Sequence, residues 1–229
     1  MGSYPIIWAL KSELRDFIRP GVRRRSTHRS LRESIMPATP GERPRLSSTE
    51  LRNRIAPFGI DRSRYPVVVV GIRGYYKNSM GAPGVNDRGI YDDALFIESP
   101  QIMVAYNGNT DPASYRAGSG TGSTKGMATL NPGAWFVHRF DKHKGQYLAL
   151  CQRAGPVNVT RDGNPPYLDT GMFGINIHRG GYNSTSSEGC QTVHPTQWDS
   201  FIATIQDQVR RYFPANWRTV TVPYILLVE

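Results

Sequence analysis

Short runs of β-branched and aromatic residues, separated by Gly, Asn and Pro, dominate the chain from residue 65 onward. Strands are predicted where apolar residues alternate with polar ones, or where a short apolar run is bounded by turn residues. Such runs lie at 65–76, 86–99, 101–110, 133–140, 146–152, 157–163, 171–179 and 218–229, with a Gly/Ser-rich loop at 113–126. This pattern predicts a mainly β domain over residues 64–229.

One segment, residues 195–213, shows the period of a helix and not that of a strand. Its apolar residues recur at helical spacing: Trp198, Phe201, Ile202, Ile205, Val209 and Phe213. Residues with this spacing share one face of a helix. Pro195 suits the first helical position, where no backbone N–H is needed. We therefore expect one helix in the C-terminal half of the domain.

Residues 1–63 have a different composition and are predicted to form a basic N-terminal arm. The segment 15–54 contains eleven Arg, four acidic residues and four Pro, a composition typical of extended or weakly structured chain. A short helix is expected over 11–18. Two interpretations of the arm stay open: a solvated linker, and a segment that docks on a larger assembly or on nucleic acid, since Arg makes bidentate contacts with phosphate.

Other bulk properties narrow the class of protein. The net charge of +10 implies anionic partners such as nucleic acid, anionic lipid or an acidic glycan. No apolar run approaches the roughly 20 residues that span a bilayer, and the apolar segment 4–10 is too short for a secretory signal. We therefore expect no membrane span and no signal peptide. The two cysteines are expected to be free thiols, with Cys151 in the core.

The sequence 174–194, GINIHRGGYNSTSSEGCQTVH, carries the candidate chemistry. His178 ends an alternating apolar run, and a glycine-rich loop then returns the chain to Gly189 and Cys190. A cysteine nucleophile needs a base, an environment that favours the thiolate, and donors for the developing oxyanion. We predict that Cys190 is the nucleophile, that His178 is its base, and that the backbone N–H groups of Gly189 and Cys190 form the oxyanion hole.

Two other interpretations of this stretch stay open. Cys190 would be a buried structural cysteine, or His178, Cys190 and His194 would bind zinc with Glu188 as the base. The spacing matches no established zinc signature, so we expect neither a metal nor a cofactor, and His194 is expected to be a structural neighbour of the helix. The group that orients His178 is left open between a backbone carbonyl and a side chain.

The segments INIHRGG and SSEGCQTV resemble the signature of the L,D-transpeptidase catalytic domain, the YkuD-like family. In that family a strand-borne His is followed, after a variable loop, by Ser-x-Gly-Cys. His178, Ser187, Gly189 and Cys190 match this signature. The resemblance covers residues 66–195 and is strongest in the last twenty.

The resemblance implies a β-sandwich fold and a substrate class. Members of the family act on the stem peptides of peptidoglycan (murein). Their cysteine attacks the carbonyl at the L-centre of a diamino acid, releases the following D-alanine and forms a thioester. An amine acceptor then gives a 3-3 crosslink, whereas water gives L,D-carboxypeptidase or endopeptidase activity. His178 would also protonate the leaving amine.

Three departures from the family pattern concern the acceptor side of the pocket, and with it the balance between transfer and hydrolysis. Glu188 stands where the family usually has His, and Gln191 and Thr192 stand where an apolar residue and then Arg or Asn usually follow the cysteine. We expect a murein hydrolase of a bacteriophage particle or lysis system, acting at the cell wall. The alternatives are a crosslinking transpeptidase, and a structural virion component with a vestigial enzyme fold and a nucleic-acid-contacting arm.

Residues around the motif are candidates for substrate binding: Arg179, Ser187, Glu188, Tyr182 and Asn183. Arg179 would either bind a substrate carboxylate or be a solvated surface residue, and Glu188 would bind the ammonium group of the diamino acid. Ser187 would brace the loop, and Tyr182 and Asn183 would either line the cleft or form the turn. His138 and His143, near Lys142 and Lys144, are expected at a polar hairpin tip.

Overall fold

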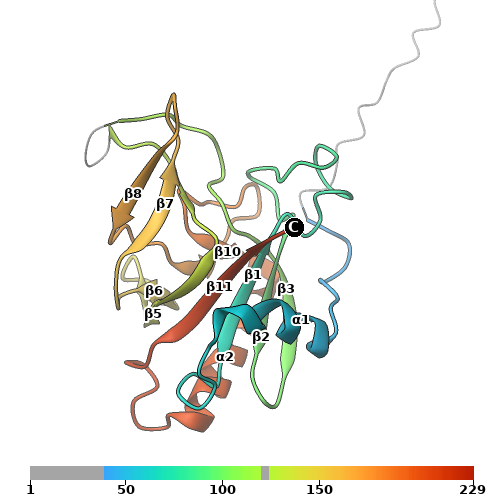
Figure 1. Cartoon of the computed structure of the whole chain (residues 1–229), viewed down its shortest axis with the longest axis vertical. Helices are drawn as coiled ribbons and strands as arrows, with labels where there is room; N and C mark the ends of the chain where they lie inside the picture. Colours follow the sequence, from blue (N-terminus) through green and yellow to red (C-terminus); the bar gives the residue numbers. More distant parts are fainter. Residues whose placement is uncertain (1–38, 120–123) are drawn as a thin grey trace, which may run out of the picture. The chain divides into compact units, whose positions relative to one another are not determined.

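The computed structural model describes residues 39–119 and 124–229, and over these residues the chain is mainly β (Figure 1). The strands are β1 Val68–Arg73, β2 Asp93–Glu98, β3 Met103–Asn109, β4 Ala128–Leu130, β5 Gly133–His143, β6 Tyr147–Gln152, β7 Val157–Arg161, β8 Tyr167–Gly171, β9 Ile177–Arg179, β10 Gln191–Val193 and β11 Val222–Val228. The helices are α1 Ser48–Ile55, η1 Ala56–Phe58, η3 Pro195–Gln197 and α2 Trp198–Tyr212. The mainly β class and the helix over 195–213 are confirmed. The helix expected over 11–18 lies outside the described residues.

Eight strands close into one barrel, in the hydrogen-bonded order β1-β11-β5-β6-β9-β10-β3-β2 and back to β1. Two of the neighbouring pairs, β1 with β11 and β9 with β10, are parallel. A parallel pair cannot be closed by a tight hairpin, so the loop 180–190 must carry the chain back along β9 before β10 begins. Strands β4, β7 and β8 form a separate three-stranded sheet. Within the described residues, no helix is long and apolar enough to cross a bilayer.

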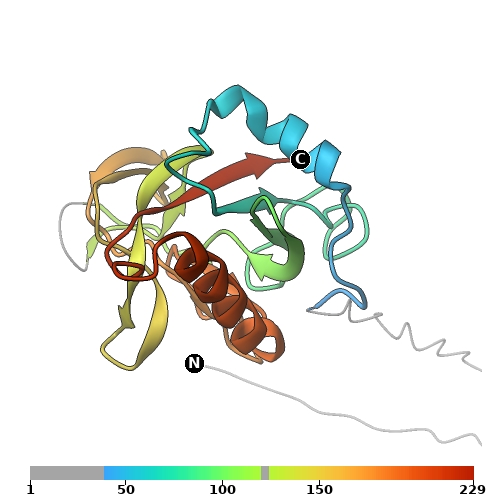
Figure 2. The same ribbon diagram turned by 90° about the horizontal axis from the view of Figure 1, so that it is seen from below.

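Strand β1 is buried on both faces, which explains its uninterrupted β-branched sequence. Val69 packs in a core cluster that includes residues of α2, whereas Val68 and Val70 pack in a second cluster with residues of α1. Successive side chains of a strand point to opposite faces, so the valines of β1 contribute side chains to both clusters. Figure 2 shows α1 and α2 on opposite sides of this part of the sheet.

Helix α1 lies in the segment that the sequence assigns to the arm. Its N-cap Ser47 accepts a hydrogen bond from the Glu50 N–H at 3.1 Å, which satisfies one of the free N–H groups at the helix start. Leu51 and Ile55, one turn apart, are buried beside β1. Over residues 48–54 the structure therefore differs from the extended or weakly structured arm expected over 15–54, because the Arg-rich composition concealed two apolar residues at helical spacing.

Three short strands near the candidate site also differ from the expected pattern. Strands β4 and β10 were not predicted, and the strand expected over 171–179 is reduced to β9. Each of these strands has three residues, too few for an alternation to be visible in sequence. Their positions depend on pairing with distant strands, so tertiary structure and not local pattern creates them.

We expect the substitution Leu51→Ala to lower the free energy of unfolding by about 2–5 kcal/mol, because it leaves a cavity beside β1. Urea denaturation followed by circular dichroism measures this loss. Leu168→Ala is the matched control, since Leu168 is 76% exposed and its truncation should change stability by less than about 0.5 kcal/mol. Equal effects of the two substitutions would show that α1 does not belong to the cooperative core.

Candidate active site

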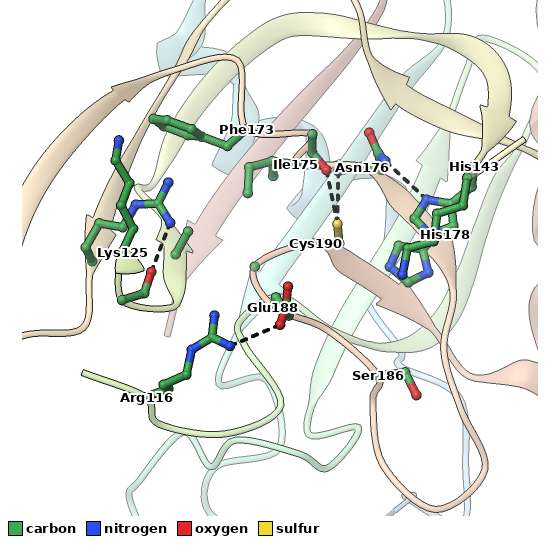
Figure 3. Close-up of a pocket in the computed structure, with 16 residues that line it drawn as sticks. Arg116, Lys125, His143, Phe173, Ile175, Asn176, His178, Ser186, Glu188 and Cys190 are labelled. Atoms are coloured by element: carbon green, nitrogen blue, oxygen red, sulfur yellow. Dashed lines mark hydrogen bonds and ion pairs between the residues drawn. The ribbon is translucent and has the colours of Figure 1, made fainter. Parts of the chain in front are cut away.

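The pairing of β9 with β10 brings the predicted nucleophile and base together. Gln191 pairs with Ile177 and Thr192 with His178 in a parallel register. Cys190 therefore lies one step before this register, beside Asn176. Because every second residue of a strand shares a face, Cys190 and His178 project from the same side of adjacent strands. Figure 3 shows both side chains in one pocket.

The Cys190 thiol lies in a pocket of about 630 Å³ and is partly exposed. The Asn176 N–H donates to Sγ at 3.4 Å, and the thiol donates to the Gly174 carbonyl at 3.2 Å. Residues of β4, β7, the β5–β6 turn and the loops before β9 and β10 line this pocket. Cys151, by contrast, is fully buried in the core, as predicted.

His178 is held in one tautomer by its own backbone. Its Nδ1–H donates to the Arg179 carbonyl at 2.7 Å, since a carbonyl oxygen only accepts. Nε2 is therefore the nitrogen with a free lone pair, as a general base requires. The side chain is 5% exposed, so packing also restricts the ring. The group that orients His178, left open by the sequence, is thus a backbone carbonyl.

A second imidazole, His143, stacks on His178. The ring centroids lie 4.1 Å apart at an interplanar angle of 19°, and the Asn176 amide lies 3.1 Å from His143 Nδ1 and donates to it. His143 lies at the tip of the β5–β6 hairpin, as expected, but its side chain is buried, whereas His138 is buried and lies away from the tip, so for His138 the expectation is wrong. His138 instead bonds the Ile175 carbonyl at 2.9 Å. The two histidines project from opposite faces of β5, and each contacts the segment just before β9, His138 at Ile175 and His143 at Asn176.

Burial shifts the base and the nucleophile toward their neutral forms. Burial and the neighbouring His143 lower the pKa of His178 to about 4. Burial raises the pKa of the Cys190 thiol to about 11, although the Asn176 N–H partly offsets this rise. Near pH 7 the pair is therefore a neutral imidazole and a neutral thiol, because a low-dielectric environment disfavours each charged form. In such a pair the thiol gives its proton to the imidazole only when the sulfur attacks, and no thiolate is present in the resting enzyme.

Ser187 fixes the backbone of the loop that carries the thiol. Its buried hydroxyl donates to the Cys190 carbonyl at 2.7 Å and accepts from the Gly189 N–H at 2.9 Å. The predicted oxyanion donor Gly189 N–H is therefore engaged, and would have to release Ser187 to bind a substrate. Among the described residues the Cys190 N–H has no acceptor, so this N–H is available to donate to a substrate oxyanion.

Gly189 is required by the backbone and by its surroundings. Its φ of +151° is disfavoured for other residues, and a Cβ would lie 2.4 Å from the Ala128 carbonyl of β4. The Ala128 N–H in turn donates to the Glu188 carbonyl at 3.1 Å. The loop before Cys190 is thus held against the three-stranded sheet, which positions the thiol at the pocket surface.

Of the predicted substrate-binding residues, Glu188 lines the pocket, where its exposed carboxylate pairs with Arg116 at 3.4 Å. Arg179 points away from it and stacks over the Tyr147 ring at 5.1 Å. Tyr182 is 75% exposed, and Asn183 is also exposed; neither lines the pocket.

Four cationic side chains that sequence reasoning missed line the pocket: Arg116, Lys125, Lys144 and Arg161. They come from three separate segments, the loop before β4, the β5–β6 turn and β7, and no local motif connects them. Glu188 is the acidic residue that shares this lining. The pocket is therefore cationic overall, which suits an anionic ligand.

The zinc interpretation finds no support in the side-chain geometry. Within residues 39–119 and 124–229, no group of three or more His, Cys, Asp or Glu side chains could hold a metal ion. His194 lies outside the pocket, where its Nδ1 contacts the Thr196 hydroxyl at 2.7 Å and caps η3. It is thus a structural neighbour of the helix.

Comparisons of the chain with protein-family models, with curated proteins and with solved structures find no match. The functional assignment therefore depends on the geometry of this pocket and on the resemblance carried by His178, Ser187, Gly189 and Cys190.

Proposed function

We propose that this protein is an L,D-transpeptidase-like cysteine enzyme that hydrolyses peptidoglycan stem peptides through a thioester. The observation that carries the proposal is the placement of the Cys190 thiol and His178 in one pocket, with the imidazole oriented by the Arg179 carbonyl. A buried structural cysteine needs no oriented imidazole beside it. The sequence signature around these residues supplies the substrate class. The closed barrel and its separate three-stranded sheet take the place of the β-sandwich that the resemblance implies.

The first half of the reaction forms the acyl-enzyme. Sγ attacks the carbonyl carbon while its proton passes to His178 Nε2, and the Cys190 N–H donates to the developing oxyanion. When the C–N bond breaks, the electron pair goes to the leaving amine and the imidazolium returns its proton there. The acyl group remains on sulfur as a thioester.

Water completes the cycle by the same proton path. His178 Nε2 takes a proton from water as the oxygen attacks the thioester carbonyl, and the C–S bond breaks with the proton returning to Sγ. The hydrolytic direction is supported by Glu188, the one departure from the family pattern that lines the pocket. Gln191 and Thr192 are buried, and Gln191 bonds the Tyr224 hydroxyl at 2.8 Å inside the barrel.

The proposal predicts that the wild-type protein converts disaccharide tetrapeptides into tripeptides plus D-alanine, and that Cys190→Ala abolishes this conversion. Mass spectrometry of the muropeptide products measures it. Cys151→Ala is the matched control, because it removes the other thiol from the core and leaves the pocket intact. Trimming that survives Cys190→Ala would refute the proposal, and 3-3 dimers in place of tripeptides would identify a transpeptidase.

The neutral state of the pair predicts a broad pH optimum. Because the pKa of His178 is lowered to about 4 and that of Cys190 is raised to about 11, the base stays unprotonated and the thiol protonated between these values. We expect kcat/KM to be level from about pH 5 to about pH 10 and to fall on the acid side as His178 gains a proton. Steady-state kinetics over this range measure the profile. An acid limb centred near 6.5, the ordinary pKa of His, would contradict the neutral pair.

A further inference from the structure

A pair of cations occupies one side of the pocket, opposite the histidines. Lys125 Nζ lies 2.6 Å from Asp169, and Arg161 Nε lies 3.0 Å from the same carboxylate oxygen. Both cations also lie over the Phe173 ring, at 5.2 and 4.5 Å from its centroid. Two positive groups share one negative group, so this cluster carries a net charge of +1. Ion pairing and cation–π contacts hold the two side chains in place.

These cations keep hydrogen-bond donors for a ligand. Arg161 uses Nε for Asp169 and Nη1 for the Gly126 carbonyl at 2.9 Å, and its guanidinium has five N–H donors in all. Lys125 has three ammonium protons, of which Asp169 takes one. The side chains are only 11% and 22% exposed, and both line the pocket. Solvent therefore screens them less than it screens fully exposed charges.

The orientation of the bound substrate determines which part of it lies beside these cations. The leaving amine must lie near His178, because that imidazole protonates it. Figure 3 shows His178 and His143 on one side of Cys190, with Lys125 and Phe173 on the other. The acyl part of the substrate, which stays on the enzyme as the thioester, therefore extends toward the two cations.

We propose that Lys125 and Arg161 form a carboxylate subsite for the acyl part of the substrate. The enzyme then selects donors whose attacked residue carries a second, free carboxylate, and discriminates against the same residue bearing a carboxamide. A carboxylate accepts charge-assisted hydrogen bonds from both cations, whereas a neutral amide leaves the net positive charge uncompensated. This subsite rests on the proposed function for the identity of the acyl part. Arg179, expected to bind a carboxylate, faces away from the pocket and cannot serve.

The test uses two muropeptide tetrapeptides that differ only in a free or amidated carboxylate on the diamino acid. Isothermal titration calorimetry with the Cys190→Ala protein measures binding without turnover. We expect the free carboxylate to bind about tenfold more tightly, the scale of one charge-assisted hydrogen bond. Lys125→Met should remove most of this preference. Asp169→Asn should increase it severalfold, because it removes the carboxylate that competes for the two cations.

Lys142→Met is the charge-matched control, because Lys142 is exposed and lies outside the pocket. The subsite is overturned if the two peptides bind equally, or if Lys125→Met and Lys142→Met have the same effect. Kinetics on wild-type protein separate this result from the proposed function. Cleavage that depends on Cys190 but ignores amidation would refute the subsite alone, whereas selective binding without any cleavage would refute the proposed reaction alone.

Discussion

The parallel pairing of β9 with β10 determines where the thiol and the imidazole lie, and the rest of the site depends on it. The register sets Cys190 one step before the Gln191–Ile177 pair, on the face that also carries His178. The loop 180–190 must return along β9 to allow this pairing, and it is fixed at both ends. The Tyr91 hydroxyl donates to the Gly181 carbonyl at 2.6 Å, and Ser187 braces the turn before Cys190. Shifting the register by one residue would move Cys190 to the opposite face from His178.

Burial gives this pair its electrostatic character. Both charged forms are disfavoured in the pocket, so the resting state is neutral and the proton moves only when a carbonyl is attacked. The stacked ring of His143 strengthens this effect, since a second imidazole lowers the pKa of His178. The cations that line the pocket act differently, because they attract an anionic ligand.

The sequence predicted that Cys190 and His178 would meet, but it did not predict most of the side chains that line the pocket around them. Cys190 and His178 lie close enough in the chain for one strand end and one return loop to join them. Adjacent residues of a strand point to opposite faces, so Arg179 of β9 projects away from the pocket that His178 lines. His143 and Arg161 reach the pocket through pairings among distant strands, which no local pattern reveals. Helix α1 had a readable signal, since Ser47 and Glu50 have the spacing of a capping box, but the surrounding Arg residues obscured it.

The central claim is that Cys190 carries an acyl group during turnover, and the most direct test is mass spectrometry of the acid-quenched protein. After brief mixing with a disaccharide tetrapeptide, the account predicts a mass increase equal to the substrate minus D-alanine, located on the peptide that contains Cys190 and removed by hydroxylamine. The Cys190→Ala protein should show no adduct. Turnover in which this thiol stays free, or an adduct on any other residue, would contradict the account.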